Sequence, residues 1–421
     1  MDTEYSSSES SEEISSSSDE NLEQSDNLKL TGQIIKNYNI ICEIGRGAFS
    51  IVWFAYNITN NNFYALKVQD PNEYNDGYQE ILFVQRLPKV PSVFNNIIEY
   101  FVEDVDNKKY LCSVWELHCS DMDSLIRKGD YYENGLPLKL AKNVMKQLIE
   151  SVKILHTKFK VFHGDIKTDN ILIKGLNDKD NFIIHKYREA NFYQKYTDAI
   201  NQFGLQKSQS LSTISQMKKE HKTKLRKKIH SEITEKILEE YSLSDVSKHS
   251  INSKYLEKLN ISLADFGTHC GEDTHYESQF GTRYYQSPEI ILMGKCSFPV
   301  DIWALGCTFY ELLSGKLLFD PIKDSQNSRD YYHLCLINET CGEFPINFIR
   351  KTKYYKDFFD SNGKIKHYKR PLENRLIRKI NELNLTSDEK KDFNNLLNQM
   401  LTIDCSKRID IEKLSVHHFF R

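Results

Sequence analysis

The octapeptide HGDIKTDN, residues 163–170, places a carboxylate, an ammonium group and an amide close together in the chain. Phosphoryl transfer needs such groups: a cradle for the triphosphate, a cation on its phosphates, oxygen ligands for magnesium and a carboxylate that orients the attacking hydroxyl. Here Asp165 would accept the hydroxyl proton, Lys167 would lie near the transferring phosphate, and Asn170 would hold a magnesium ion. The octapeptide therefore predicts phosphoryl-transfer chemistry, provided that the other parts are present.

A second magnesium ligand is predicted at Asp265, which begins the triplet DFG directly after the strand-like run ISLA. Asp165, Asn170 and Asp265 are far apart in sequence, and either triplet alone could arise by chance. Because both occur in order and in the expected context, we interpret them as one site.

The phosphate cradle is predicted at GRGAFS, residues 45–50, between two β-rich stretches. Gly45 and Gly47 would let backbone N–H groups approach phosphate oxygens, while Ser50 takes the place of a third glycine. Lys67 in ALKV would bind the α- and β-phosphates, and Glu80 in GYQEILFVQRL would be its partner, although Glu73 lies nearby. A glycine-rich hairpin alone is usually only a turn, so the prediction of a phosphate cradle depends also on the lysine that follows it.

Composition limits the classes of protein to consider. The chain has 421 residues, 39% hydrophobic content and a formal net charge of -3, so it can bury a large core and does not favour nucleic acid as a partner. Its nine cysteines form no C-x-x-C pair, which argues against a disulfide framework or zinc site and for an intracellular, cytoplasmic or nuclear, location. We see no run of about 18 apolar residues and expect no membrane span.

Strand-like stretches come first and helical patterns follow, which predicts an α+β fold with two lobes. Residues 1–37 read as an acidic, Ser-rich disordered tail. We expect an N-lobe of antiparallel strands with one main helix, its hinge, and a larger helical C-lobe divided by an insert. The predicted ranges are 38–118 for the N-lobe and hinge, 119–175 for the first part of the C-lobe, 176–259 for the insert and 260–421 for the rest.

The insert is polar and contains the strongest basic run of the chain, MKKEHKTKLRKKIH, residues 217–230. This run could bind an import factor or another acidic partner. A solvated, weakly helical face is the interpretation that we favour, and a short helix is predicted after it.

These motifs resemble those of the eukaryotic protein kinases, and within them most closely the SR-protein kinases. The resemblance rests on GRGAFSIVW, YALKVQDPNEYNDGYQEILFVQRL, ENGLP, ILHTKFKVFHGDIKTDNILI, the long insert and FDPIKDSQNSRDYYHLCLI. It implies a bilobal kinase fold, ATP and Mg²⁺ as cofactors, and protein substrates that are Arg/Ser-rich or otherwise basic. We expect the enzyme to act as a monomer.

The resemblance also assigns further residues. It implies that Thr282 bridges to the catalytic Asp and indicates Ser/Thr specificity, and that Trp115 screens the back of the adenine pocket. Asp301 would hold the catalytic-loop backbone, and Glu289 would pair with Arg408. The residues that it places around the nucleotide are Gly45, Gly47, Ser50, Val52, Ala65, Lys67, Glu116, His118 and Leu172.

Gly164 and two substrate positions depart from common kinase patterns. Many kinases have an arginine where Gly164 stands, and its charge awaits a phosphate on the activation segment; glycine has no charge to neutralise, so we hypothesise activity without that phosphate. Gln286 stands where SR-protein kinases have an arginine. Of two docking-groove carboxylates, one falls on Tyr332 and only Glu339 is acidic, which predicts weakened Arg-Ser recognition.

An alternative from another class remains open, namely a scaffold protein that uses a kinase-like fold with little catalysis. Another is a kinase with a different substrate preference, such as a dual-specificity enzyme.

Overall fold

The structure is a computed structural model, and it describes residues 30–47, 49–105, 108–128, 131, 134–206, 219–244, 251, 253–271, 278–324, 327–369 and 375–421. Of the predicted tail, residues 1–29 lie outside the described part. The predicted end of the tail, at residue 37, is too late, because β1 (Ile34–Ile35) already pairs with β2 ahead of Tyr38. The account below concerns residues 31–421, which form one unit.

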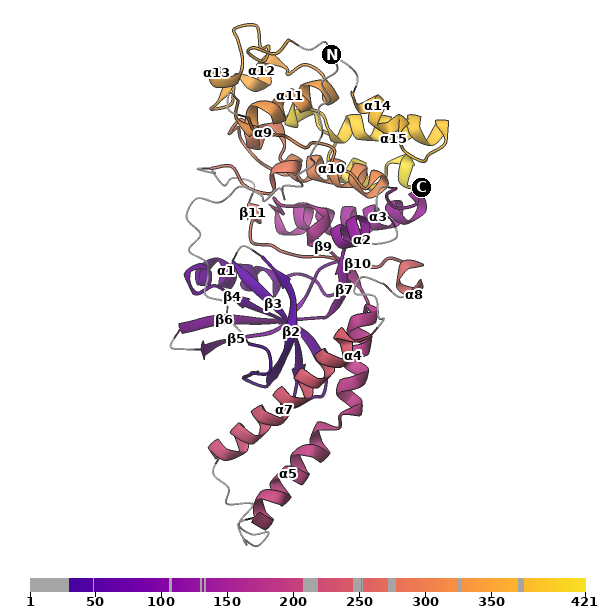
Figure 1. Ribbon diagram of the computed structural model, residues 1–421. Helices are drawn as coiled ribbons and strands as arrows, with labels where there is room; N and C mark the ends of the chain where they lie inside the picture. Colours follow the sequence, from indigo (N-terminus) through magenta and orange to yellow (C-terminus); the bar gives the residue numbers. More distant parts are fainter. Residues whose placement is uncertain are drawn as a thin grey trace, which may run out of the picture. The chain divides into compact units, whose positions relative to one another are not determined.

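The N-lobe is an antiparallel sheet in the order β1-β2-β3-β4-β6-β5 (Figure 1). β-branched and aromatic side chains alternate across its strands, so Phe54 on β3 and Leu66 on β4 are fully buried. Helix α1 (Tyr74–Val84) packs against β5 and β6. The strands are β2 (Tyr38–Arg46), β3 (Ser50–Asn57), β4 (Phe63–Gln69), β5 (Ile97–Val105) and β6 (Lys108–Trp115).

The C-lobe is mostly helical and is organised around α10 (Pro299–Ser314), in which every residue from Val300 to Ser314 is buried. Helix α3 (Leu138–Ile154) packs on it with an apolar stripe that includes Val144, Leu148 and Val152. The other helices are α2 (Met122–Lys128), α9 (Pro288–Ile291), α11 (Arg329–Cys341), α12 (Ile346–Ile349), α13 (Tyr355–Phe358), α14 (Arg375–Asn381), α15 (Ser387–Met400) and α16 (Ile411–Ser415).

Besides the N-lobe sheet, the described residues form two small sheets. One has the order β10-β9-β7, with β7 (His118–Asp121), β9 (Ile171–Lys174) and β10 (Ile261–Leu263), and the other pairs β8 (Val161–Phe162) with β11 (Cys270–Gly271). The predicted α+β class with two lobes is confirmed.

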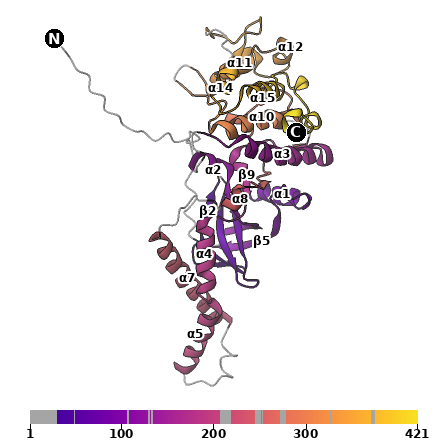
Figure 2. The same ribbon diagram turned by 90° about the vertical axis from the view of Figure 1, so that its right-hand side faces the viewer.

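The predicted insert contains α4 (Asp178–Glu189), α5 (Phe192–Gln206), α7 (Lys219–Ser242) and α8 (Ser253–Leu256). Helix α7 lies beside α4 and α5 (Figures 1 and 2). The basic run is more helical than expected, because its described residues belong to the 24-residue helix α7. Most of its described side chains are exposed as expected, whereas Ile229 and, beyond the run, Ile233 and Ile237 pack against α4 and strands β2 and β3. Of the basic run, residues 217 and 218 lie outside the described part. No helix among the described residues is long and apolar enough to cross a membrane.

Candidate active site

A cleft of about 900 Å³ lies between the sheet and the helical lobe. It brings together residues that are widely separated in the chain, from the glycine-rich turn to the DFG triplet. The predicted residues that line it are Gly45, Gly47, Ser50, Val52, Ala65, Lys67, Glu80, Trp115, Glu116, His118, Asn170, Leu172 and Asp265.

Lys67 and Glu80 form the predicted pair, with 2.7 Å between Nζ and Oε2. Burial alone would lower the pKa of Lys67, but the carboxylates of Glu80 and Asp265 hold it above its ordinary value, so the ammonium stays charged. The other oxygen of Glu80 accepts a hydrogen bond of 3.2 Å from the backbone N–H of Phe266. Helix α1 is thereby tied to both β4 and the DFG triplet.

Gly45 lies near the end of β2, where it pairs with Val52, and Gly47 lies at the turn between β2 and β3, where its N–H donates to the carbonyl of Ser50 at 2.9 Å. A Cβ added at either glycine would meet its nearest neighbour at 3.7 Å, which is an ordinary contact. Neither has a positive φ. The fold itself therefore does not require glycine here, whereas a phosphate group close to the backbone would.

Asp165 is held by the activation segment, which runs from Asp265 to Glu289. The backbone N–H of Thr282 donates to Asp165 Oδ1 at 2.6 Å, and Lys167 Nζ lies 3.3 Å from Asp165 Oδ2. Lys167 also donates to the hydroxyl of Thr282 at 2.8 Å. The three residues form one group in which the carboxylate and ammonium face the same region, as an attacking hydroxyl and a departing phosphate require.

Asp301 on α10 fixes the backbone of the catalytic loop, as predicted. Its two oxygens accept from the N–H groups of His163 at 2.8 Å and Gly164 at 2.9 Å. Burial would raise the pKa of Asp301, but hydrogen bonds, led by the one from His156, keep it lowered. Gly164 has φ +81, and a Cβ there would lie 3.0 Å from the carbonyl oxygen of Thr268. The loop thus favours glycine for steric reasons.

The two predicted magnesium ligands lie at the same end of a strand pair. β9 begins directly after Asn170 and β10 ends two residues before Asp265, and Ile171 pairs with Leu263. The amide of Asn170 donates to the carbonyl of Asp165 at 2.8 Å. An amide and a carboxylate offer the oxygen ligands that Mg²⁺ prefers when phosphates supply others, so the residues present fit the ion.

The end of the cleft that is predicted to take adenine includes Trp115, which is 6% exposed and donates from Nε1 to Ser113 at 2.9 Å. His118 Nδ1 lies 3.1 Å from the carbonyl oxygen of Glu116. Burial lowers the pKa of His118, which therefore stays neutral. Residues 116–118 thus place backbone polar groups next to the bulky apolar side chain of Trp115.

Glu339 is not brought to the cleft. It lies on α11, where Arg375 Nη1 approaches its Oε2 to 3.0 Å and the Tyr368 hydroxyl donates to Oε1 at 3.2 Å. Tyr332 on the same helix bonds to Asp324. The carboxylate predicted for substrate docking is thus engaged by an arginine of the chain itself.

Gln286 and the pair of Glu289 with Arg408 stabilise the end of the activation segment. The amide of Gln286 donates to the carbonyls of Phe280 at 2.9 Å and Gly281 at 3.3 Å. The predicted pair of Glu289 with Arg408 is present, at 2.6 Å, and both side chains are almost completely buried.

Sequence reasoning missed a set of polar groups that also line the cleft. They come from β7, α2, the catalytic loop and the first helix of the insert, and no motif marks them in the sequence. The side chain of Asn177, ahead of α4, donates to the carbonyl of Cys119 at 2.7 Å and so attaches the insert to the hinge. The set comprises Asp121, Asp123, Ser124, Asp169, Asn177, Lys179 and Asp180.

Comparison with known proteins agrees with this geometry. The protein kinase domain family matches residues 38–185 and 251–420, and the unmatched stretch lies within the insert. A protein of Acanthamoeba polyphaga mimivirus named as a serine/threonine-protein kinase is 27% identical over 92% of this chain and 88% of its own length. The serine/threonine-protein kinase SRPK of Physarum polycephalum is 29% identical, over 80% and 75%.

A further relative is SRSF protein kinase 3 of Mus musculus, 24% identical over 78% of this chain and 76% of its own length. The family match covers well over half of the chain. The chain therefore belongs to the protein kinase family, as a serine/threonine kinase similar to the SR-protein kinases.

Proposed function

We propose that this kinase transfers the γ-phosphate of magnesium-bound ATP to Ser or Thr in basic, Arg/Ser-rich proteins, without needing a phosphate on its own activation segment. ATP is the phosphoryl donor that a protein kinase domain implies. The observation that carries the proposal is the convergence of Lys67, Asn170 and Asp265 on one cleft, with Asp165 Oδ2 3.3 Å from the amide nitrogen of Asn170.

In this proposal each residue has one role. Lys67, held by Glu80, binds the α- and β-phosphates; Asn170 and Asp265 would hold the metal ion, which would supply positive charge to the phosphates. Asp165 orients the substrate hydroxyl and accepts its proton. Lys167 contacts the transferring phosphate, and its bond to Thr282 keeps it beside Asp165.

Contacts between protein groups support activity without phosphorylation. Arg283 forms an ion pair with Asp330 of α11 and donates to Gln279 at 3.0 Å, and Gln279 in turn donates to Asp330 at 3.1 Å. Together with the Gln286 contacts, these bonds connect residues 279–286 to one another and to α11, which supports activity without a phosphate on this segment. Residues 272–277 lie outside the described part of the chain.

A preference for basic substrates is supported by two carboxylates that line the cleft, Asp121 and Asp169, whereas the neighbouring Asp123 is already paired with Arg127. Burial is the main reason that the pKa values of Asp121 and Asp169 are raised, and neighbouring carboxylates add to it, so a substrate guanidinium would relieve repulsion there. Docking at Glu339 would require the substrate to compete with Arg375.

The test is transfer of radiolabel from ATP to a peptide library by protein made in bacteria and treated with phosphatase. We expect Ser/Thr labelling, strongest in Arg-flanked peptides, and loss of at least about a thousandfold in Asp165→Ala. Labelling that survives in Asp165→Ala, or that requires an upstream kinase, would refute the respective part of the proposal.

A further inference from the structure

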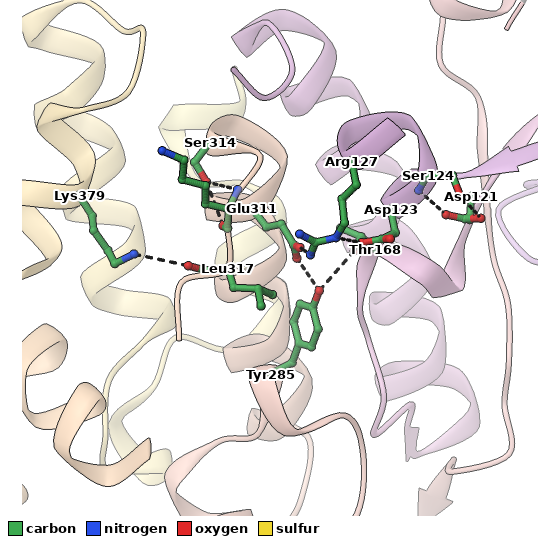
Figure 3. Close-up of polar contacts among 11 residues, drawn as sticks. Asp121, Asp123, Ser124, Arg127, Thr168, Tyr285, Glu311, Ser314, Leu317 and Lys379 are labelled. Carbon is green, nitrogen blue, oxygen red and sulfur yellow. Dashed lines mark hydrogen bonds and ion pairs between the residues drawn. The ribbon is translucent and has the colours of Figure 1, made fainter. Parts of the chain in front are cut away.

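Five polar side chains from four elements form a closed ring of contacts next to the catalytic loop (Figure 3). Two come from α2, one from the turn η3 (Thr168–Asn170), one from the turn η4 (Arg283–Tyr285) and one from α10. They are Asp123, Arg127, Thr168, Tyr285 and Glu311.

The contacts run round the ring without a gap. Arg127 donates from Nε to Asp123 and from Nη2 to Glu311, and the Tyr285 hydroxyl donates to the other oxygen of Glu311. The hydroxyl oxygen of Thr168 lies 3.3 Å from Asp123 Oδ1 and 3.3 Å from the hydroxyl oxygen of Tyr285.

The ring joins the two segments that hold the catalytic carboxylate. Thr168 follows Asp165 by three residues in the catalytic loop, and Tyr285 follows Thr282 by three residues in the activation segment. Since Thr282 contacts both Asp165 and Lys167, the position of Tyr285 bears on the geometry of the reacting groups.

The number of protons decides whether all five contacts can be hydrogen bonds. With both carboxylates ionised, Arg127 supplies two protons and the two hydroxyls one each, which makes four. When Tyr285 donates to Glu311 and Thr168 donates to Asp123, the contact between the two hydroxyls has no proton. A proton on Glu311 would be donated to Tyr285, which could then donate its own to Thr168.

Glu311 is the carboxyl of the ring that would take this proton, because it is 0% exposed whereas the Asp123 side chain is 20% exposed. The groups that face it are Arg127 and Asp123 from α2, Asp169 from the catalytic loop, Tyr285 from η4 and Cys307 on α10. Burial raises the pKa of Glu311 to about 7, against the lowering effects of Tyr285 and Arg127.

We propose that Glu311 is a proton-linked positioning residue: its protonated form completes the ring and couples the activation segment to the catalytic loop, and its ionisation loosens that coupling. Phosphoryl transfer should therefore weaken as Glu311 loses its proton. The role goes beyond the proposed function, since it concerns how the reacting groups are held.

The test is the pH profile of Glu311→Gln beside the wild type. Glutamine has the shape of the protonated acid, accepts from Arg127 and donates to Tyr285 at any pH. We expect the ratio of kcat, variant over wild type, to rise about three- to tenfold from pH 6 to pH 8.5, the worth of one hydrogen bond. The control is Glu412→Gln, on the exposed side of α16, whose ratio should stay constant. A constant ratio for Glu311→Gln would overturn the proposal.

Two further measurements keep the proposal testable if kcat of Glu311→Gln is hard to interpret. Tyr285→Phe removes the link, so kcat should fall while KM for ATP is unchanged, and the fall should be larger at pH 6 than at pH 8.5. An equal fall at both pH values would contradict the proton link.

The second measurement does not depend on catalysis. Because the folded state holds the Glu311 proton more tightly than the unfolded state, the contribution of Glu311 to the stability of the wild type decreases as pH rises from about 5 to 8, and this contribution is absent in Glu311→Gln. The melting temperature of the variant relative to the wild type should therefore rise over this range. A constant difference would refute the proton link even in an inactive preparation.

Discussion

Gly47 and Gly164 show that a position in the chain can favour glycine for two different physical reasons. Gly164 has φ +81, and a Cβ there would lie 3.0 Å from the carbonyl oxygen of Thr268, so the catalytic loop itself requires glycine. Gly47 has no such constraint, since its nearest neighbour would be 3.7 Å away. What Gly47 accommodates must therefore come from outside the chain.

The first prediction concerns this difference. Gly47→Ala should leave the free energy of unfolding within about 0.5 kcal/mol of the wild type but raise KM for ATP about five- to tenfold, because the methyl group keeps the phosphates from the backbone. Gly164→Ala should instead lower the unfolding free energy by about 1 kcal/mol or more. Urea titrations and ATP saturation curves measure both, and an unchanged KM in Gly47→Ala would contradict the phosphate cradle.

The second prediction concerns His333. It is 0% exposed, and neither ring nitrogen has a hydrogen-bond partner among the described residues. Burial, with a smaller effect of Arg283, lowers the pKa of His333 to about 3. Below pH 6.5 His333 is protonated in the unfolded chain but stays neutral in the folded chain. Its contribution to the free energy of unfolding therefore falls as pH decreases, by about 2 kcal/mol between pH 7 and pH 5.

His333→Phe should remove that acid-dependent loss and should be neutral or stabilising at pH 7, because no ring nitrogen is left unpaired. Urea unfolding at pH 5 and 7 measures this. The matched control is His185→Phe, on the exposed face of α4, which should keep the pH dependence of the wild type. A variant of His333 with undiminished acid sensitivity would show that another group is responsible.

At the scale of elements, the insert is part of the N-lobe core. Tyr187 of α4 contacts Asn39 of β2 at 2.6 Å and His230 of α7 at 2.7 Å, and its ring lies 4.8 Å from that of Tyr56 on β3. The strands that carry the glycine-rich turn are therefore covered by the insert. Removing the insert would expose their apolar face.

The third prediction is that Ile233→Ala, on the buried face of α7, lowers the free energy of unfolding by about 2 to 5 kcal/mol, because it leaves a cavity against β2 and β3. The control is Lys227→Ala on the exposed face, with an expected change below about 0.5 kcal/mol. Chemical denaturation measures both, and equal small effects would mean that the insert does not contribute to the core.

The sequence predicted the antiparallel N-lobe from strand-like stretches and the residues of the phosphate site from short motifs. It also contained Ile229, Ile233, Ile237 and Tyr241 at four-residue spacing, but the surrounding charges concealed this stripe. The pairing of Glu339 with Arg375 could not be predicted, since it depends on how α11 meets α14. The ring that contains Glu311 could not be predicted for the same reason, because its members come from four elements that share no sequence motif.

At the scale of the molecule, the cleft residues are divided between the two lobes. Lys67 and Glu80 belong to the sheet and α1, whereas Asp165, Asn170 and Asp265 belong to the C-lobe. The bond from the Phe266 N–H to Glu80 crosses between them. A ligand that contacts both sets should stabilise the whole protein.

The fourth prediction follows from this division. Mg²⁺ and ATP together, at about a hundred times the dissociation constant, should stabilise the folded chain by about 2.7 kcal/mol. Chelation of the metal by EDTA, or the change Asp265→Asn, should remove most of the gain, because the phosphates then lack their counter-ion. Thermal unfolding with and without ligand measures it, and a gain that is insensitive to EDTA would contradict a metal role for Asp265.

The most direct measurement is a crystal structure with a nonhydrolysable ATP analogue and Mn²⁺, which the anomalous signal locates. We predict a Mn²⁺ ion about 2.0 to 2.3 Å from oxygens of Asn170 and Asp265, phosphates beside Lys67 and Gly47, and Asp165 facing the γ-phosphate. A nucleotide bound elsewhere, or Mn²⁺ without contact to either side chain, would contradict the assignment of this cleft as the site of phosphoryl transfer.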